Sequence, residues 1–367
     1  MSSPPPQASS RTASLTVAVA GATSTCGARI VHRLQARSAT PGSGVGEVIG
    51  IAAQPGTHPG VSWRSADIAR PAVATALAGV DVLVWVAQET DLQSVLGRRG
   101  RERRLRTLRT AQALLMSAAA TGVGHLVVVT SAEVYGALAD NPVPLPEDAP
   151  LRAVGDDGLV GDLLAVEELL TESRDVHPGL RVSVVRPAAL VGPGVDTVLT
   201  RHFEAPRLLA VRGSTPSWQF CHVEDLSEAL VRVAEGGLGP IVTVGASGVL
   251  TQAQVERLSG MRRIELSEAA ALATAEQLHR VGVLPTPSSE LSYVLHPWAV
   301  SSATLVAHGW QAAYDNETCL GVLLAEITGR HALAARRLDR MDAALGAASA
   351  AVALVGTAAM LRRARRR

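Results

Sequence analysis

The residues Gly21-Ala-Thr-Ser24-Thr-Cys-Gly27 form a small, glycine-bearing segment between an apolar run and a helical pattern. A turn without bulky side chains lets backbone N–H groups at the start of a helix approach a pyrophosphate, and the helix dipole favours the negative charge there. Gly21 and Gly27 supply such a turn, with Ser24 in place of a middle glycine. The segment predicts the phosphate-binding turn of a dinucleotide site, and a plain tight turn is the alternative.

A second group of reactive side chains lies in residues 130–136, Thr-Ser-Ala-Glu-Val-Tyr-Gly, directly after a run of valines. It places a hydroxyl at Ser131, a carboxyl at Glu133 and a phenol at Tyr135. Further carboxyl groups follow at Asp156, Asp157 and Asp162. A carboxylic acid whose pKa is raised in a closed pocket can exchange protons near neutral pH, so these residues are candidate acids or bases. The competing interpretation is structural, with Asp156 and Asp157 capping a helix and Tyr135 packed in the core.

The elements that must position these residues follow from hydrophobic periodicity. Short runs rich in Val and Ile alternate with patterns that have apolar residues at three- and four-residue spacing. The runs cover 15–20, 47–52, 80–87, 125–131, 181–186 and 240–244, and the helical patterns include ARIVHRLQAR, LRTLRTAQALLMSAAATG and GDLLAVEELLTES. Nearly continuous apolar strands separated by helices indicate a parallel sheet covered on both faces. We therefore predict an α/β protein with a doubly wound parallel sheet (Rossmann fold), a smaller C-terminal substrate lobe and a terminal helix.

Long irregular segments follow several of these strands. Residues 137–158 are rich in Pro and Gly, and residues 187–216 have little periodicity. Both follow the carboxyl ends of strands, where doubly wound folds bind their ligands. We predict a disordered tail over 1–14, an NAD(P)-binding Rossmann domain with substrate-lobe insertions over 15–245, a smaller α/β lobe over 246–328 and an Ala/Arg-rich helix over 329–367.

Several motifs, in their order and spacing, resemble the extended short-chain dehydrogenases/reductases grouped as NAD-dependent epimerase/dehydratase proteins. The matching segments are the turn at 21–27, Ser65-Ala-Asp67-Ile68, residues 131–136, Val185-Arg-Pro with Gly192-Pro-Gly, and His222-Val-Glu-Asp225-Leu. The resemblance implies that Ser131 hydrogen-bonds the substrate oxygen being oxidised or reduced, and that Asp67 and Ile68 contact the adenine. It further implies a nicotinamide dinucleotide, a nucleotide sugar or related alcohol as substrate, and a homodimer, which the arginines near residue 100 would oppose.

One pair of residues expected from this resemblance is missing. Family members carry a Tyr-x-x-x-Lys pair after the serine, in which the lysine lowers the pKa of the tyrosine and holds the cofactor ribose while the tyrosine moves the proton. With Glu167 as the anchor, these positions fall on Leu159 and Leu163, and the chain contains no lysine. Leucine can neither transfer a proton nor carry charge, so another group must act or turnover is lost.

The cofactor site also departs from the usual pattern. An acidic residue after the second strand binds the adenine ribose hydroxyls in many such folds, and a nearby arginine favours a ribose phosphate. Here the second run ends in Ile51-Ala-Ala-Gln54-Pro, and Gln54 brings no charge, so both NAD and NADP remain open. The expected cofactor-binding residues are Gly21, Ser24, Gly27, Gln54, Asp67, Ile68 and Ala87, and the expected catalytic residue is Ser131.

Composition argues against several other functions. Aromatic residues make up only 3% of the chain, too few for the stacking surfaces of proteins that read single-stranded nucleic acid, so no nucleic-acid partner is expected. The three cysteines and ten histidines lack the spacing of metal ligands or of a disulfide framework. We expect no metal and a reducing, cytoplasmic compartment.

The positive charge is concentrated in two arginine-rich stretches. Residues 98–109 hold seven Arg against Glu102, and residues 330–367 hold nine Arg against two Asp. The first can attract a phosphate-bearing ligand or an acidic membrane, although a solvated helix face is the simpler interpretation. The second ends an apolar run at 343–361, in which nine of 19 residues are Ala. We favour a docked helix there, with anchoring to an anionic membrane as the alternative.

Two functions therefore stand beside each other. The first is an NAD(P)-dependent oxidoreductase or epimerase in which Ser131 orients the substrate and an unidentified group moves the proton. The second is a dinucleotide or metabolite sensor, or a membrane-associated scaffold, that has kept the fold without turnover. The missing tyrosine and lysine favour the second, and the family resemblance favours the first.

Overall fold

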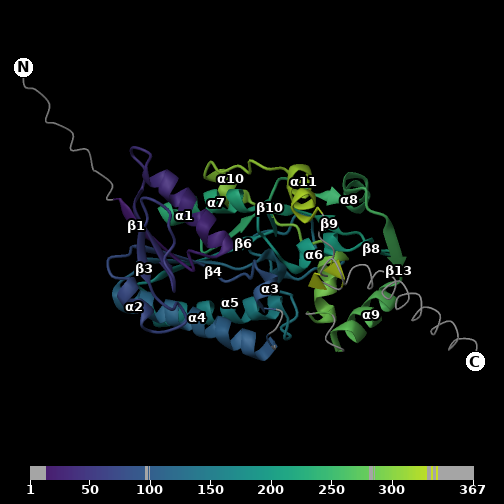
Figure 1. Cartoon of the computed structure of the whole chain (residues 1–367), viewed down its shortest axis with the longest axis horizontal. Helices are drawn as coiled ribbons and strands as arrows, with labels where there is room; N and C mark the ends of the chain where they lie inside the picture. Colours follow the sequence, from purple (N-terminus) through teal and green to yellow (C-terminus); the bar gives the residue numbers. More distant parts are fainter. Residues whose placement is uncertain are drawn as a thin grey trace, which may run out of the picture.

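A seven-stranded parallel sheet forms the centre of the molecule (Figure 1). The computed structural model describes residues 14–328, except 96, 97, 99, 281–283 and 285, together with 332–333 and 336–337. The sheet consists of β1 (Leu15–Ala20), β2 (Val45–Ala52), β3 (Ser62–Ser65), β4 (Val82–Val86), β5 (His125–Val129), β6 (Arg181–Pro187) and β11 (Ile241–Val244). Their order is β11-β6-β5-β4-β1-β2-β3, so the chain winds outward in both directions from the β1–β4 pair. The predicted doubly wound Rossmann fold is confirmed.

The six apolar runs form strands because their residues are buried on both faces of the sheet. In β1, Val17 and Val19 join the core on one face, and Ala18 and Ala20 join the core on the other. The edge strand β3 differs, because its sequence SWRS is partly exposed and has no apolar run. Hydrophobic runs alone therefore do not reveal β3, although the resemblance places a third strand before Asp67.

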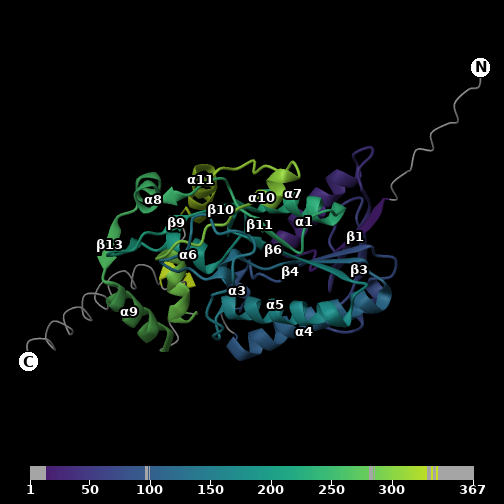
Figure 2. The same cartoon turned by 180° about the vertical axis from the view of Figure 1, so that it is seen from behind.

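Helices cover the two faces of the sheet (Figures 1 and 2). One face carries α1 (Thr25–Ser38) and α7 (Val223–Glu235), which are joined by the ion pairs Arg29–Glu224, Arg33–Glu228 and Arg37–Glu235. The other face carries α2 (Val73–Ala76), α4 (Gly100–Thr121) and α5 (Leu159–Val176), and the short α3 (Leu92–Val95) follows β4. Within the arginine-rich stretch, Arg98 thus lies just before α4, and residues 100–109 form the first half of this helix.

Smaller sheets and helices make up the rest of the described structure. Two-stranded sheets pair β7 (Ala189–Val191) with β10 (Phe220–His222), β9 (Ser217–Trp218) with β12 (Leu250–Thr251), β8 (Leu208–Val211) with β13 (Arg263–Leu266), and β14 (Ala332–Leu333) with β15 (Arg336–Arg337). The helices in this part are η1 (Ala132–Tyr135), α6 (Val198–Glu204), α8 (Gln252–Ser259), α9 (Glu268–Arg280), η2 (Ser288–Val294), α10 (Ala303–Ala307) and α11 (Asn316–Ile327). Within the described ranges, no helix has both the length and the apolar character needed to cross a bilayer. Of the predicted tail at 1–14, only Ser14 lies within those ranges. Of the predicted helix at 329–367, only 332–333 and 336–337 do, and these residues form β14 and β15 instead of a helix.

Candidate cofactor and substrate site

The turn between β1 and α1 has a backbone that only glycine can provide at two positions. Gly21 has a φ of +75°, in the left-handed region. A Cβ atom on Gly27 would lie 2.2 Å from the carbonyl oxygen of Gly21, so no side chain fits there. Ser24 is the N-cap of α1, and its Oγ accepts a hydrogen bond from the Gly27 N–H at 3.1 Å. A ligand phosphate can therefore approach the backbone closely at the positive end of the α1 dipole.

A cavity of about 310 Å³ opens at the carboxyl ends of β1 and β4. These two strands are neighbours, and the chain order reverses between them. Doubly wound folds bind their ligands at this reversal point. The volume lies at the lower end of the range of small-molecule sites, about 300 to 1,000 Å³.

Most of the expected cofactor residues meet at this cavity. Its lining includes Gly21, Ser24, Asp67, Ile68 and Ala87. Gly27 lies behind the turn, packed against Gly21. Gln54 is exposed in the bend after β2 and does not line the cavity, so the structure does not bring it together with the other six.

A smaller cavity of about 70 Å³ adjoins the larger one. The two share five lining residues, Ala87, Gln88, Glu89, Arg103 and Thr107. Leu159 and Leu163, one turn apart on α5, also line the smaller cavity, as does Glu133. Leu159 and Leu163, which the family resemblance implies as the places of the tyrosine and lysine, therefore line a cavity that also contains a carboxyl group.

Ser131 and Glu133 are held together by two hydrogen bonds. Ser131 Oγ accepts from the Glu133 N–H at 3.2 Å and donates to Glu133 Oε2 at 3.1 Å. Ser131 is 1% exposed and does not itself line either cavity. Burial raises the pKa of Glu133 to about 7, opposed by the hydrogen bond from Ser131. A carboxyl with that pKa can both donate and accept a proton near neutral pH.

Glu290 brings a second carboxyl group to the smaller cavity. Its Oε1 accepts hydrogen bonds from the N–H groups of Leu159 at 2.6 Å and Val160 at 3.3 Å, so it caps the N-terminus of α5 from η2. Burial and the charge of Glu133 raise the pKa of Glu290 to about 8, in spite of these bonds. Both carboxyl groups line the smaller cavity, and each has a pKa above its ordinary value.

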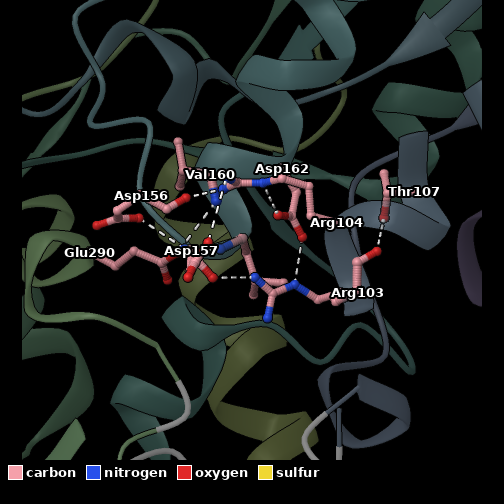
Figure 3. A network of polar contacts seen from close by, with 10 residues as sticks. Arg103, Arg104, Thr107, Asp156, Asp157, Val160, Asp162 and Glu290 are labelled. Carbon is pink, nitrogen blue, oxygen red and sulfur yellow. Dashed lines mark hydrogen bonds and ion pairs between the residues drawn. The ribbon is translucent and has the colours of Figure 1, made fainter. Parts of the chain in front are cut away.

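Two arginines of α4 form hydrogen bonds and ion pairs with the start of α5 and the loop before it, as Figure 3 shows. Asp162 accepts hydrogen bonds from Arg103 Nε at 2.6 Å and from Arg104 Nε at 3.0 Å. Arg103 Nη2 also donates to the carbonyl of Asp157 at 2.6 Å, and Arg104 Nη2 donates to the carbonyl of Asp156. The side chain of Asp156 accepts from the Gly158 N–H, one residue before α5. The predicted capping by this loop is thus only partial, because Glu290 serves the first N–H groups of the helix.

Tyr135 has a structural place. It is fully buried, and its hydroxyl donates to the carbonyl of Glu147 at 2.6 Å and accepts from Arg186 Nη1 at 2.8 Å. Arg186 in turn forms a buried ion pair with Glu167 at 2.5 Å, and Glu167 also accepts from Thr130. These contacts join β5, β6 and α5 beneath the site, and they leave Tyr135 no free proton-transfer path.

Sequence reasoning missed two residues of the site as site residues. Glu290 carries no local signal, because its partners Leu159 and Val160 lie 131 and 130 residues away in the chain. Arg103 belongs to the arginine stretch that the charge pattern revealed, but only the packing of α4 against α5 places it between the two cavities.

Family comparison agrees with this geometry. Residues 17–245, more than half of the chain, match the model of the NAD dependent epimerase/dehydratase family. The chain belongs to this family. An uncharacterized protein of Mycobacterium tuberculosis is 30% identical over 200 residues, which are 53% of this chain and 52% of that protein. An uncharacterized protein of Sinorhizobium fredii is 29% identical over 187 residues, 48% of this chain and 43% of that protein. This epimerase/dehydratase family member thus spans about half the length of the curated relatives that it matches.

Solved structures of family enzymes share its fold. A dTDP-glucose 4,6-dehydratase from Streptomyces venezuelae with NAD bound superposes with a TM-score of 0.63 at 19% identity, covering 86% of this chain and 97% of the enzyme. The UDP-glucuronic acid 4-epimerase from Bacillus cereus in complex with NAD gives a TM-score of 0.59 at 15% identity, covering 86% and 99%. The UDP-glucose 4-epimerase from Thermotoga maritima, solved with UDP-glucose, gives 0.61 at 12% identity, again covering 86% and 99%.

Proposed function

We propose that this protein is an NAD(P)-dependent oxidoreductase or epimerase that acts on a nucleotide sugar or a related alcohol, with Glu133 as the group that moves the proton. One observation carries the proposal. The cavity at the glycine turn adjoins a second cavity, which is lined by a carboxyl with a pKa of about 7 and by two leucines at the positions where the resemblance implies tyrosine and lysine.

The residues around the larger cavity fit a dinucleotide. Gly21 and Ser24 offer the backbone of the turn to the pyrophosphate, and Asp67 and Ile68 lie where an adenosine would rest. When bound, the nicotinamide exchanges a hydride with a carbinol carbon of the substrate. Ala87 and Gln88, at the junction of the two cavities, line the place where that exchange would occur.

The chain's own task is to handle the proton. As the C–H bond of the carbinol breaks and the hydride leaves, the hydroxyl proton passes to the Glu133 carboxylate and a carbonyl forms. In the reverse direction, the protonated carboxyl returns that proton to the oxygen. Ser131 positions Glu133 through its Oγ. We propose that this hydroxyl turns from Glu133 Oε2 to the substrate oxygen when substrate binds.

A second candidate function is dinucleotide or metabolite binding without turnover. The apolar side chains of Leu159 and Leu163 in the smaller cavity favour it, because neither can act as acid, base or ribose ligand. Only kinetics with defined variants separates the two.

The test is turnover with UDP-glucose, UDP-glucuronic acid and dTDP-glucose in the presence of NAD or NADP, followed by nicotinamide absorbance and product analysis. We expect Glu133→Gln to lower kcat about 100-fold or more, since general acid–base catalysis typically contributes that much. Glu168→Gln, an exposed carboxyl on α5, is the control and should leave kcat unchanged. Equal activity of Glu133→Gln and the wild type would refute the role of Glu133. Dinucleotide binding without turnover on a broad alcohol panel would establish the second function.

A further inference from the structure

Three arginines line the larger cavity from the side of α4. Arg98 lies in the turn before the helix, and Arg103 and Arg106 lie within it. Arg103, Arg106, Thr107 and Thr110 all line this cavity, and their spacing of three, four and seven residues from Arg103 puts them on one face of the helix. We call Arg98, Arg103 and Arg106 the arginine wall. It faces the same space as the glycine turn, although α4 and α1 cover opposite faces of the sheet.

Arg103 is the fixed member of the wall. Its Nε and Nη2 are held by Asp162 and the Asp157 carbonyl at 2.6 Å each, and its side chain is 10% exposed. Its third guanidinium nitrogen, Nη1, has no hydrogen-bond partner among the described residues (Figure 3). Arg103 lines both cavities, and Nη1 is the guanidinium nitrogen that these two bonds leave available to a ligand.

The other two members form no ion pair within the part of the chain that the structure describes, although the charge of Arg98 acts on Glu89 and lowers its pKa against the effect of burial. The carboxyl groups that line the cavity are already engaged. Asp67 pairs with Arg70 at 3.1 Å, and Glu89 Oε1 accepts the N–H groups of Thr90 and Asp91. The wall therefore holds more positive charge than its surroundings neutralise.

We infer that the arginine wall binds the phosphates of the dinucleotide, on the side of the cavity away from the glycine turn. This inference rests on the proposed function and assigns residues that the glycine turn does not include. The turn supplies only backbone N–H dipoles, whereas guanidinium groups supply full charges and paired donors for phosphate oxygens. In a chain without lysine, these arginines are the only full cations among the described residues that line either cavity.

Comparison of variants at Arg103 and Arg104 distinguishes a role in ligand binding from a role in structural support. Both hold Asp162 and a carbonyl of the loop before α5, but Arg104 lines neither cavity. We expect Arg103→Gln to weaken binding of NAD and of ADP-ribose about 10-fold or more in calorimetric titrations, whereas Arg104→Gln leaves both affinities within about twofold. Equal weakening by the two variants would show a structural role only and overturn the inference, as would no weakening by Arg103→Gln.

If Arg103→Gln does not fold, variants of Arg106 and Arg109 provide a second comparison. Arg106 and Arg109 are both exposed on α4, but only Arg106 lines the cavity, and neither has an ion-pair partner among the described residues. Arg106→Gln should weaken ADP-ribose binding several-fold and reduce its salt dependence, and Arg109→Gln should do neither. Identical behaviour of the two variants would contradict the wall.

Inorganic pyrophosphate distinguishes this inference from the proposed function. If the wild type binds pyrophosphate through Arg103 and Arg106 but binds no dinucleotide, the arginines form a phosphate site, but the inference that these phosphates belong to a dinucleotide fails together with the proposed function. If dinucleotides bind with full affinity to both wall variants, only the wall fails. If the wild type binds neither ligand, both fail.

Discussion

Among single residues, the buried carboxyl groups of Glu133 and Glu290 matter most for the proposed proton transfer. Glu133 lies two residues after Ser131, so the sequence alone makes it a candidate, and the structure adds the cavity and the raised pKa. Glu290 was beyond sequence reasoning, because its position depends on how η2 packs against the start of α5. The resemblance likewise names the places of a missing tyrosine and lysine, but it does not say which group stands beside them.

The raised pKa values predict how stability varies with pH. The native pKa of Glu133 is about 7 and that of Glu290 about 8, both above the ordinary value of 4.5. Between those limits the native state binds more protons than the unfolded state, so these groups lower stability as the pH rises. Burial lowers the native pKa of His125 and His202 to about 4, which has the opposite effect between pH 4 and 6.5. A single stability curve therefore mixes the two.

Comparison of Glu133→Gln with the wild type removes the carboxyl of Glu133, together with the effect of its charge on Glu290. The free energy of unfolding of the variant should rise relative to the wild type by roughly 1.4 kcal/mol per pH unit between the unfolded and native pKa of this group, then level off above about pH 7. Urea denaturation at several pH values measures this. If the difference in free energy of unfolding between the variant and the wild type does not vary with pH, burial does not raise the pKa of Glu133.

At the scale of elements, the glycine turn makes the sharpest prediction. Gly27→Ala would bring a Cβ atom to 2.2 Å from the Gly21 carbonyl oxygen, so either the turn or α1 must move. We expect a loss of about 1 to 3 kcal/mol in the free energy of unfolding, together with loss of dinucleotide binding. Denaturant unfolding and calorimetry measure the two effects.

The control for this substitution is Gly179→Ala, in the exposed turn between α5 and β6. A Cβ atom there meets nothing within 4 Å, so stability should change by well under 1 kcal/mol and binding not at all. If Gly27→Ala matched Gly179→Ala in both respects, the turn would not be a phosphate-binding turn.

Hydrophobic periodicity predicted most helices and strands, because the helices are buried on one face and the central strands on both. The six apolar runs are strands with ends shifted by no more than two residues, and α1, α4 and α5 follow from their three- and four-residue spacing. The strand β3 escapes this reasoning, since an edge strand with the sequence SWRS needs no apolar run. The link between α4 and α5 also escapes it, since Arg103 and Asp162 are 59 residues apart.

In the molecule as a whole, the fold brings four segments that are distant in the sequence together at the carboxyl ends of the central strands. The turn after β1, the residues after β4, the start of α5 and η2 meet where the strand order reverses. The family match and the superposed enzymes agree with this architecture, whereas the proposed chemistry rests on Glu133 and must be tested at that residue.

A crystal structure with NAD or NADP bound would show whether the dinucleotide occupies the larger cavity with its nicotinamide near Glu133. The account predicts a pyrophosphate between the Gly21–Gly27 turn and the arginine wall, with the nicotinamide ring at the junction of the two cavities, within reach of a substrate oxygen beside Glu133. A dinucleotide bound elsewhere, or crystals soaked to saturation that show no density in this cavity, would contradict it.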